Sequence, residues 1–206
     1  MTSALAGFAI GAAFGSIPFA WLLHLLATGR DLRREGSGNP GATNVERSAG
    51  PGWGAAALAL DAGKGAAAVL VAVRWAGADA GVPAALGAVL GHVFTPWLSG
   101  RGGKGVATTA GAYALLAPAA TGASLLVFAL AVATTRYVSL GSVLGAAALP
   151  IAVLLAGPGT RAAGVAAALA AVIAWRHREN FARMRAGVEP RLGRRARGPG
   201  GAGVDS

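Results

Sequence analysis

Long apolar runs, separated by shorter polar segments, dominate the pattern of the chain. A helix that crosses the hydrocarbon core of a bilayer needs about 20 mostly apolar residues. The pattern predicts seven such helices, near residues 4–27, 53–75, 82–99, 105–118, 121–135, 138–157 and 160–175. Because the third, fourth and fifth are short, five or six spans with re-entrant segments also fit. We therefore expect an all-α fold, a multi-pass transmembrane helical bundle of about seven spans.

The composition supports a membrane protein over a soluble helical bundle. Hydrophobic residues make up 54% of the chain and charged residues 13%, about half the charged share of a typical soluble domain. Small residues dominate the apolar runs, where they allow close helix packing. We expect a single membrane-embedded domain over 1–187. The remainder, 188–206, is rich in Arg, Gly and Pro and predicts a disordered tail whose arginines contact anionic lipid.

The charges predict an orientation in the membrane. The net charge is +10, and the basic residues fall mainly in alternate loops and in the tail, with Arg74 and Arg161 as exceptions. The positive-inside rule then places the N-terminus outside and the C-terminus in the cytoplasm. The first run is too long for a signal h-region and lacks a basic n-region, so we interpret it as a membrane helix. Nucleic acid is not an expected partner, because apolar runs interrupt the basic residues and no aromatic platform accompanies them.

A first candidate site is the glycine-rich loop Glu35-Gly-Ser-Gly-Asn-Pro-Gly-Ala-Thr-Asn44 with Arg47 behind it. Glycines free the backbone so that successive N–H groups can converge on one anion. Side chains that can add donors to a bound phosphate are Ser37, Asn39, Thr43, Asn44 and Arg47. The alternative is a turn-rich loop that caps a helix.

A second candidate is Gly100-Arg-Gly-Gly-Lys-Gly-Val-Ala-Thr108, which opens a predicted helix. A glycine loop with a lysine at a helix N-terminus is an anion site in principle, here with Gly102, Gly103, Lys104 and Gly105. The spacing differs from that of a nucleotide-binding P-loop, which disfavours nucleotide hydrolysis. A flexible interfacial turn with snorkelling cations is the alternative.

A third candidate is His177-Arg-Glu-Asn180, directly after the last predicted span. On a helix His177 and Asn180 share a face, and we expect Glu179 to anchor a nearby arginine. A cluster that only sets topology is the alternative.

Three further polar residues lie within the apolar runs. Asp61 and Lys64 stand three residues apart and can neutralise each other, and His92 lies in the third run. Ionisable residues inside a membrane are functional candidates, although a structural pair and a packing histidine explain them nearly as well. Few such groups lie at depth and no internal repeat is evident. A small transporter of an anionic solute is therefore the weaker functional alternative.

The sequence lacks the motifs of several kinds of nucleophilic and metal-dependent enzymes. The chain has no cysteine, which removes disulfides, thiolate metal sites and a cysteine nucleophile. It contains no Gly-x-Ser-x-Gly elbow, no His-x4-Asp pair and no metal-binding motif. We expect neither a metal nor a cofactor.

Together, the three loops resemble the motifs of the bacterial acyl-phosphate:glycerol-3-phosphate acyltransferase family (PlsY). The matching segments are Gly36–Asn44, Gly102–Thr108 and His177–Asn180, supported by Gly15-Ser-Ile-Pro18, Leu60-Asp-Ala-Gly-Lys-Gly65 and Gly91-His-Val-Phe94. The likeness covers nearly all of the chain except the tail. It implies an enzyme of the bacterial plasma membrane that takes a fatty acyl group from acyl phosphate, not from acyl-CoA or acyl-carrier protein. The acceptor would be the 1-hydroxyl of sn-glycerol 3-phosphate, and the product lysophosphatidic acid for phospholipid synthesis.

The resemblance also implies roles for the candidate residues. Ser37, His177 and Asn180 would be catalytic, and the remaining loop residues would bind phosphate and glycerol. Arg101 and Phe181 stand where the family commonly has Lys and Ile. An acyl phosphate has a good leaving group, so the reaction needs positioning and charge stabilisation more than a strong protein nucleophile. A soluble acyl-phosphate synthase that docks on the cytoplasmic face is a further candidate partner.

Overall fold

The computed structural model describes residues 2–193, and these form a bundle of α-helices without strands. The helices are α1 (Thr2–Ser16), α2 (Phe19–Thr28), α3 (Ala42–Ala49), α4 (Pro51–Ala76), α5 (Gly81–Val93), α6 (Val106–Leu116), α7 (Pro118–Thr135), α8 (Val138–Ala156), α9 (Thr160–Arg176) and α10 (Arg178–Arg185). Short 3-10 helices lie at Leu32–Arg34 (η1), Ala78–Ala80 (η2) and Pro96–Leu98 (η3). The predicted all-α class is confirmed.

Five helical stretches in this part of the chain are long and apolar enough to cross a membrane. They are Thr2–Thr28, Pro51–Ala76, Ala78–Leu98, Pro118–Thr135 and Val138–Ala156. Two shorter helices, α6 with 11 residues and α9 with 17, occupy the positions of the other two predicted spans. The chain is therefore a multi-pass membrane protein with about seven membrane elements.

The first span is broken, although the sequence pattern predicts one continuous helix over 4–27. α1 ends at Ser16 and α2 begins at Phe19, because Pro18 lacks a backbone N–H and its ring disturbs the preceding turn. Polar side chains bond the carbonyls at the break. Lys64 Nζ donates to the Ile17 oxygen at 2.7 Å, and Thr95 Oγ1 donates to the Ser16 oxygen at 2.5 Å. A broken helix is stable at membrane depth where such partners replace the lost bonds.

α1 packs closely along α5, and glycines make this possible. Gly7, Gly11 and Gly15 recur every four residues on the buried face of α1. A Cβ added to Gly11 would collide with the carbonyl group of Ala84 on α5. Small residues at this spacing let two helix backbones touch, which is how membrane helices associate without a hydrophobic driving force. The contact holds α5, and with it His92 near its end, in a defined position.

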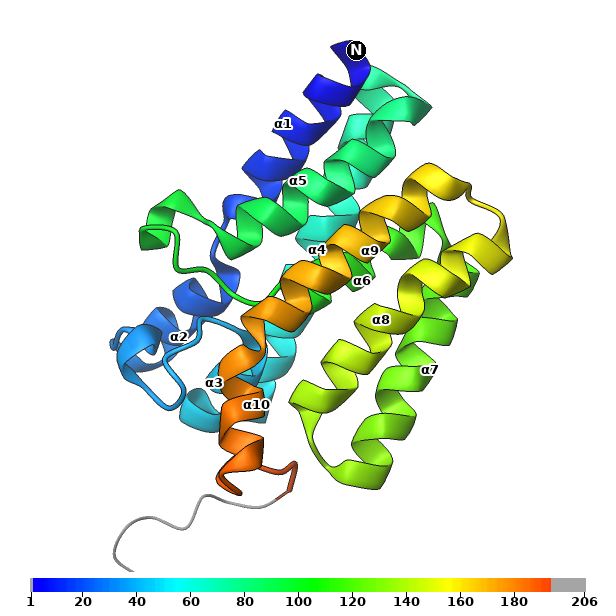
Figure 1. The fold of residues 1–206 in the computed structure, drawn as a ribbon. Coiled ribbons are helices and arrows are strands. Elements are labelled where there is room, and N and C mark those ends of the chain that lie inside the picture. Colours follow the sequence, from blue (N-terminus) through cyan, green and yellow to red (C-terminus); the bar gives the residue numbers. More distant parts are fainter. Residues whose placement is uncertain (1, 194–206) are drawn as a thin grey trace, which may run out of the picture.

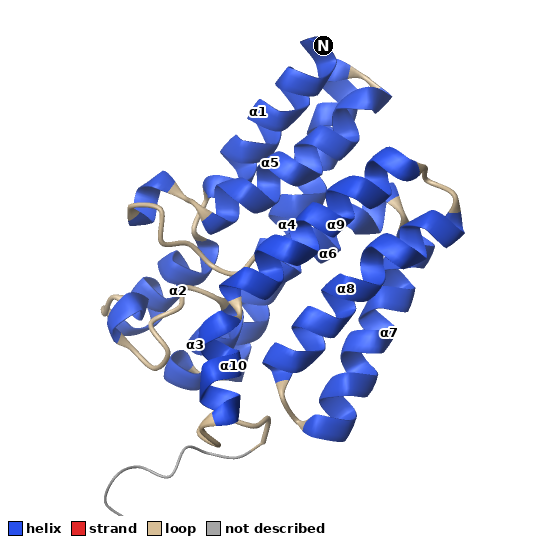
Figure 2. Ribbon diagram, in the orientation of Figure 1, coloured by secondary structure: helices blue, strands red, loops and turns tan. Residues whose placement is uncertain are grey.

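Figure 1 shows how the helices are arranged in the bundle. α1, α4 and α5 lie on one side, the antiparallel pair α7 and α8 lies on the other, and α9 runs between them. α2, α3 and α10 gather at the end of the bundle away from the N-terminus. The loops before α3 and before α6, drawn in tan in Figure 2, lie beside this group. All three sequence motifs therefore reach the same end of the bundle.

Candidate active site

A cavity of about 280 Å³ lies where the three motifs meet. Its polar wall contains most of the predicted site residues and two further charged residues: Ser37, Asn39, Thr43, Asn44, Arg47, Asp61, His92, Lys104, His177, Asn180, Arg183 and Glu189. Its apolar wall comes mainly from α6, α7, α8 and α9 and includes Val106, Ala110, Leu125, Phe128, Leu149 and Ile173. One side of the cavity therefore suits anions, and the other suits a hydrocarbon chain.

Asn44 shapes the first glycine-rich loop from inside. Its side-chain oxygen accepts a hydrogen bond from the backbone N–H of Ser37 at 3.1 Å. Its side-chain nitrogen donates to the carbonyl oxygens of Glu35 at 2.9 Å and Leu32 at 3.3 Å. The amide of Asn44 is thus engaged by the loop itself. The hydroxyl of Ser37 has no partner among residues 2–193, and Ser37 and Asn39 both line the cavity. No side chain caps the N-terminus of α3, which begins directly after Gly41.

The second glycine loop lies against the end of α5. A Cβ at Gly102 would collide with the carbonyl oxygen of His92, and one at Gly103 would collide with the imidazole ring of His92. The N–H of Gly102 donates to the Val93 oxygen at 3.0 Å, and Arg176 donates to the Gly102 oxygen at 2.7 Å. Glycine is required at both positions by packing, a reason that the motif alone does not reveal.

The same loop presents free donors at the start of α6. Gly105, with φ of 86°, is the N-cap residue of α6, and no side chain caps the helix. Within residues 2–193, no acceptor takes the amide hydrogens of Gly103, Lys104 or Gly105. Unpaired N–H groups at a helix N-terminus attract anions, and the Lys104 side chain adds a positive charge beside them. This geometry makes the loop an anion site.

A chain of hydrogen bonds holds Lys104 in place. The Lys104 ammonium donates to the side-chain oxygen of Asn180. Asn180 Nδ2 in turn donates to Glu189 Oε1 at 2.6 Å. The Glu189 carboxylate also accepts from Ser139 at 2.8 Å and pairs with Arg183 at 2.8 Å. Asn180 therefore links the cation of the loop to a buried carboxylate.

The surroundings of these hydrogen bonds alter the ionisation of Lys104 and Glu189. Burial, together with the nearby Arg183 charge, lowers the pKa of Lys104 to about 8, although Glu189 opposes the shift. Burial alone would raise the pKa of the Glu189 carboxyl. The hydrogen bonds from Asn180, Ser139 and Arg183 outweigh that effect and lower it. Glu189 is therefore an anion at neutral pH.

Glu189 and Arg183 were missed by the sequence reasoning. Glu189 falls in the segment predicted to be disordered, yet it is buried, and the N–H of Leu192 bonds to the Arg136 oxygen at 2.8 Å. Residues 188–193 thus belong to the folded structure, because Glu189 anchors them. The rest of the predicted tail, 194–206, lies outside the described residues. One signal was available: Glu189 is the only acidic residue between 180 and 204.

His177 is neutral and has a defined tautomer. Its Nδ1 lies 2.7 Å from the Ile173 carbonyl oxygen. A carbonyl only accepts, so Nδ1 carries the hydrogen and Nε2 presents a lone pair. Burial, together with the charge of Lys104, lowers the pKa of His177 to about 4. The ring is therefore an acceptor at Nε2 over the neutral pH range.

Glu179 lies at the edge of the site. Its carboxylate is exposed and 3.7 Å from Arg178. It borders a smaller recess of about 50 Å³ that also contacts Arg176, Arg183 and Lys104. Its predicted role, the anchoring of a nearby arginine, stays a prediction. The buried carboxylate that contacts Asn180 and Arg183 belongs to Glu189. The Arg178 guanidinium lies over the ring of Trp175.

Asp61, Lys64 and His92 form one buried cluster. Asp61 and Lys64 make the expected ion pair at 2.7 Å, and Lys64 Nζ also lies 2.8 Å from His92 Nδ1. Asp61 and His92 reach the cavity wall. Residues 2–193 contain no group of three or more His, Asp or Glu side chains placed to hold a metal ion.

Comparison with known proteins identifies the family. The glycerol-3-phosphate acyltransferase family model matches residues 5–187. The chain belongs to the glycerol-3-phosphate acyltransferase family. A glycerol-3-phosphate acyltransferase from Rhodopseudomonas palustris (strain BisB5) is 46% identical over 190 residues, which cover 92% of this chain and 96% of the relative. One from Geobacter sulfurreducens is 45% identical over 86% of this chain and 92% of its own length.

Solved structures agree with this assignment of the acyltransferase. The crystal structure of PlsY, described as an integral membrane glycerol 3-phosphate acyltransferase, matches in its glycerol 3-phosphate form with a TM-score of 0.86. It is 37% identical and covers 93% of this chain and 96% of PlsY. The lysophosphatidic acid form matches with a TM-score of 0.81 and 35% identity. The predicted family, the enzyme class and the membrane fold are confirmed, which supports an enzyme over a transporter.

Proposed function

We propose that this acyltransferase transfers a fatty acyl group from acyl phosphate to the 1-hydroxyl of sn-glycerol 3-phosphate. The products are 1-acylglycerol 3-phosphate, which is lysophosphatidic acid, and inorganic phosphate. The likeness to PlsY in its glycerol 3-phosphate and lysophosphatidic acid forms supports both the acceptor and the product. The resemblance of the three motifs supports acyl phosphate as the donor.

The observation that carries this proposal is the two-sided cavity. At its polar wall the uncapped N-termini of α3 and α6 meet the side chains of Lys104, Arg183 and Arg47. Two phosphate groups need such a concentration of donors and positive charge. The opposite wall, from α7 and α8, offers Leu125, Phe128 and Leu149 to an acyl chain. The reacting carbonyl group is then held at the boundary between the two walls.

The acyl group passes directly between the two substrates. The chain has no cysteine, and no hydroxyl group in the cavity wall is hydrogen-bonded to a histidine. An activated serine nucleophile needs such a base. The 1-hydroxyl oxygen of glycerol 3-phosphate therefore attacks the acyl carbon, and the bond from that carbon to the phosphate oxygen breaks. Phosphate leaves with the bonding electron pair.

His177 orients the attacking hydroxyl, and the departing phosphate takes its proton. The Nε2 lone pair of His177 can accept a hydrogen bond from the hydroxyl. The pKa of His177, about 4, makes the ring a weak final proton acceptor. The second pKa of a phosphate group, about 6, makes the leaving group the better acceptor. Substrate positioning and anion stabilisation then supply most of the rate.

The other predicted residues take binding and positioning roles. Ser37, Asn39, Thr43, Arg47 and the amides of 103–105 bind phosphate oxygens. Asn180 positions the Lys104 ammonium. Asn44 gives the first loop its shape.

We place this site on the cytoplasmic side, with the N-terminus outside, from the distribution of the basic loops. A soluble synthase that supplies acyl phosphate would approach the same face.

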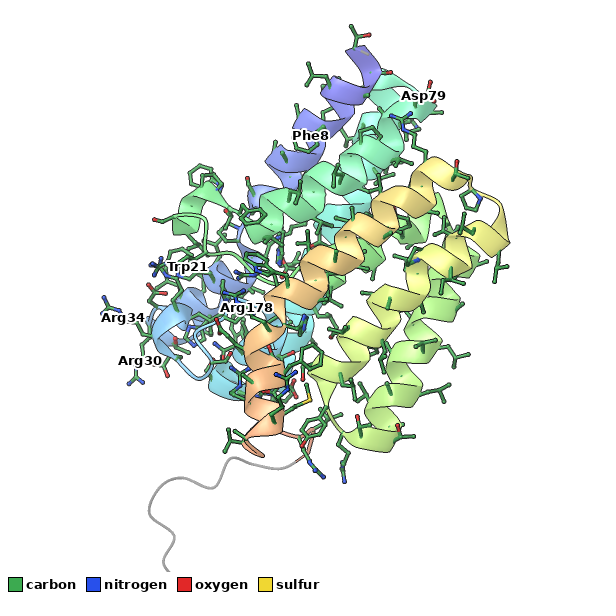
Figure 3. The ribbon with its side chains drawn as sticks, in the orientation of Figure 1. Phe8, Trp21, Arg30, Arg34, Asp79 and Arg178 are labelled. Atoms are coloured by element: carbon green, nitrogen blue, oxygen red, sulfur yellow. The ribbon has the colours of Figure 1, made fainter. Side chains whose placement is uncertain are left out.

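An assay in proteoliposomes tests the reaction. Purified enzyme receives glycerol 3-phosphate with acyl phosphate, acyl-CoA or acyl-carrier protein in separate reactions, and mass spectrometry identifies the product. Lysophosphatidic acid is expected from acyl phosphate only, and equal yield from acyl-CoA would contradict the donor. Lys104→Ala and His177→Ala should lower kcat/KM by about 10²–10³-fold, the effect of removing one oxyanion donor. The exposed Arg34, which points away from the bundle in Figure 3, supplies the control Arg34→Ala.

A further inference from the structure

His92 belongs to a buried polar cluster that the proposed reaction has not yet used. Lys64 Nζ lies 2.8 Å from His92 Nδ1, 2.7 Å from Asp61 Oδ1 and 2.7 Å from the Ile17 oxygen. All three side chains of the cluster are buried. The ammonium therefore has three close partners: it pairs with the Asp61 carboxylate and makes hydrogen-bond contacts with Ile17 and His92.

These contacts determine which nitrogen of His92 carries hydrogen. Asp61 is closer to Lys64, at 2.7 Å, than to His92, at 3.6 Å, so the carboxylate pairs with the ammonium. A charged lysine only donates hydrogen bonds. Nδ1 of His92 must then accept from Lys64, which leaves the hydrogen of the neutral ring on Nε2.

The Nε2 atom faces the glycine loop. A Cβ placed on Gly103 would collide with Nε2, so the ring edge lies directly against the loop backbone. No acceptor for Nε2 exists among residues 2–193, and His92 shares the cavity wall with Lys104 and Gly105. The Nε2 hydrogen is therefore available beside the free amides of Gly103, Lys104 and Gly105.

We propose that His92 donates its Nε2 hydrogen to a phosphate group bound over Gly103–Gly105, and that Asp61 and Lys64 hold His92 in the tautomer that can do so. The inference rests on the proposed function for the identity of the ligand, a substrate phosphate. His92 and His177 then line one cavity in opposite tautomers, one as donor and the other as acceptor. Asp61 and Lys64 are positioning residues, since they act through His92.

Nitrogen NMR on histidine-labelled protein tests the tautomer. The chain has only three histidines, His24, His92 and His177, so His92→Gln identifies the His92 signals by their loss. We expect hydrogen on Nε2 of His92 and on Nδ1 of His177. Lys64→Met should move part of the His92 population to the other tautomer. Hydrogen on Nδ1 of His92 in the unaltered protein would overturn the proposal.

Binding and kinetics test the donor. His92→Leu removes the N–H group, whereas His92→Gln retains one near the Nε2 position. A hydrogen bond to a charged group is worth about 1.5–3 kcal/mol. The dissociation constant of inorganic phosphate, from phosphorus NMR titration, should therefore rise roughly 10- to 100-fold in His92→Leu and much less in His92→Gln. Equal effects in the two variants, or none, would contradict the proposal.

Kinetics on the same variants distinguish the two substrate phosphates. A rise in KM confined to glycerol 3-phosphate assigns the loop to the acceptor, and one confined to acyl phosphate assigns it to the donor. An unchanged KM for both would overturn the proposal. If His92→Leu does not fold, Lys64→Met replaces it and should weaken phosphate binding in the same direction. The NMR and phosphate titrations need no turnover, so they test His92 even if the enzyme proves to use another acyl donor.

Discussion

At the scale of single residues, the ionisation of Lys104 links the site to pH. Its pKa is lowered to about 8 by burial first and then by Arg183, and Glu189 raises it. As pH rises through this value the ammonium loses its proton and no longer attracts phosphate. We expect kcat/KM, which reports the free enzyme, to fall above about pH 8. Removing the Glu189 charge in Glu189→Gln should shift this fall to lower pH.

Lys104→Arg is the matched control for this pH profile. Arginine keeps the positive charge but does not titrate in the accessible range, so its profile should lose the fall above pH 8 even if its activity is lower. The measurement is kcat/KM between pH 6 and about 10 for the three proteins. An unchanged limb in Lys104→Arg would show that another group controls it.

Which of these residues could be predicted from sequence depended on how local their chemistry is. Ser37, Lys104 and His177 stand in motifs whose residue types indicate anion binding, and the structure places all three in one cavity. The contact of Lys104 with Asn180 joins positions 76 residues apart, so no spacing rule predicts it. Glu189 was missed because its segment reads as a basic, glycine-rich tail, and burial by tertiary contacts outweighs composition.

At the scale of helices, hydropathy predicted the membrane elements well but not their interruptions. The apolar run 4–27 contains Pro18, and hydropathy alone does not reveal whether a membrane proline kinks a helix or ends it. Here it ends α1, because Lys64 on α4 and Thr95 in the turn after α5 bond the carbonyls at the break. The same lysine contacts His92, so the break and the site depend on one side chain.

The pair α7 and α8 should set the length of acyl chain that the cavity accepts. Leu149 is buried in the cavity wall and is the wall residue of α8 farthest from Ser139, which contacts Glu189. At 1.5 Å per residue it lies about 17 Å along the helix from Val138. Leu149→Trp should exclude the end of a long chain. Excluding two methylene groups from the cavity removes about 1.6 kcal/mol of burial free energy. The preference for the long chain should then fall roughly 15-fold.

This prediction is measured as kcat/KM across a series of acyl phosphates of increasing length. Long chains should lose rate in Leu149→Trp while short chains keep it. Leu144→Trp on the same helix is the control, because Leu144 is exposed and lies outside the cavity wall. A uniform loss over all lengths would indicate general damage to the fold and would count against the assignment of this wall to the acyl chain.

At the scale of the whole molecule, the site and most of the arginines occupy the same end of the bundle. Arg30 and Arg34 mark that end in Figure 3, and Asp79 in η2 marks the opposite one, close to the N-terminus. A phosphorylated substrate does not cross the hydrocarbon core unaided, because burying its charge is too costly. The face that carries the arginines must therefore be the face on which the soluble substrate is present.

Labelling of introduced cysteines tests this orientation directly, since the chain has none of its own. Asp79 and Arg30 are both exposed. A maleimide that cannot cross the membrane should label Asp79→Cys in intact bacterial cells, and Arg30→Cys only after the membrane is opened. Leu126→Cys on α7, exposed on the apolar surface, should react slowly in both conditions because lipid disfavours the reactive thiolate. Labelling of Arg30→Cys in intact cells would show the opposite orientation, with the phosphate loops outside. The proposed use of a soluble cytoplasmic acceptor would then be wrong, whereas the contacts within the cavity would stand.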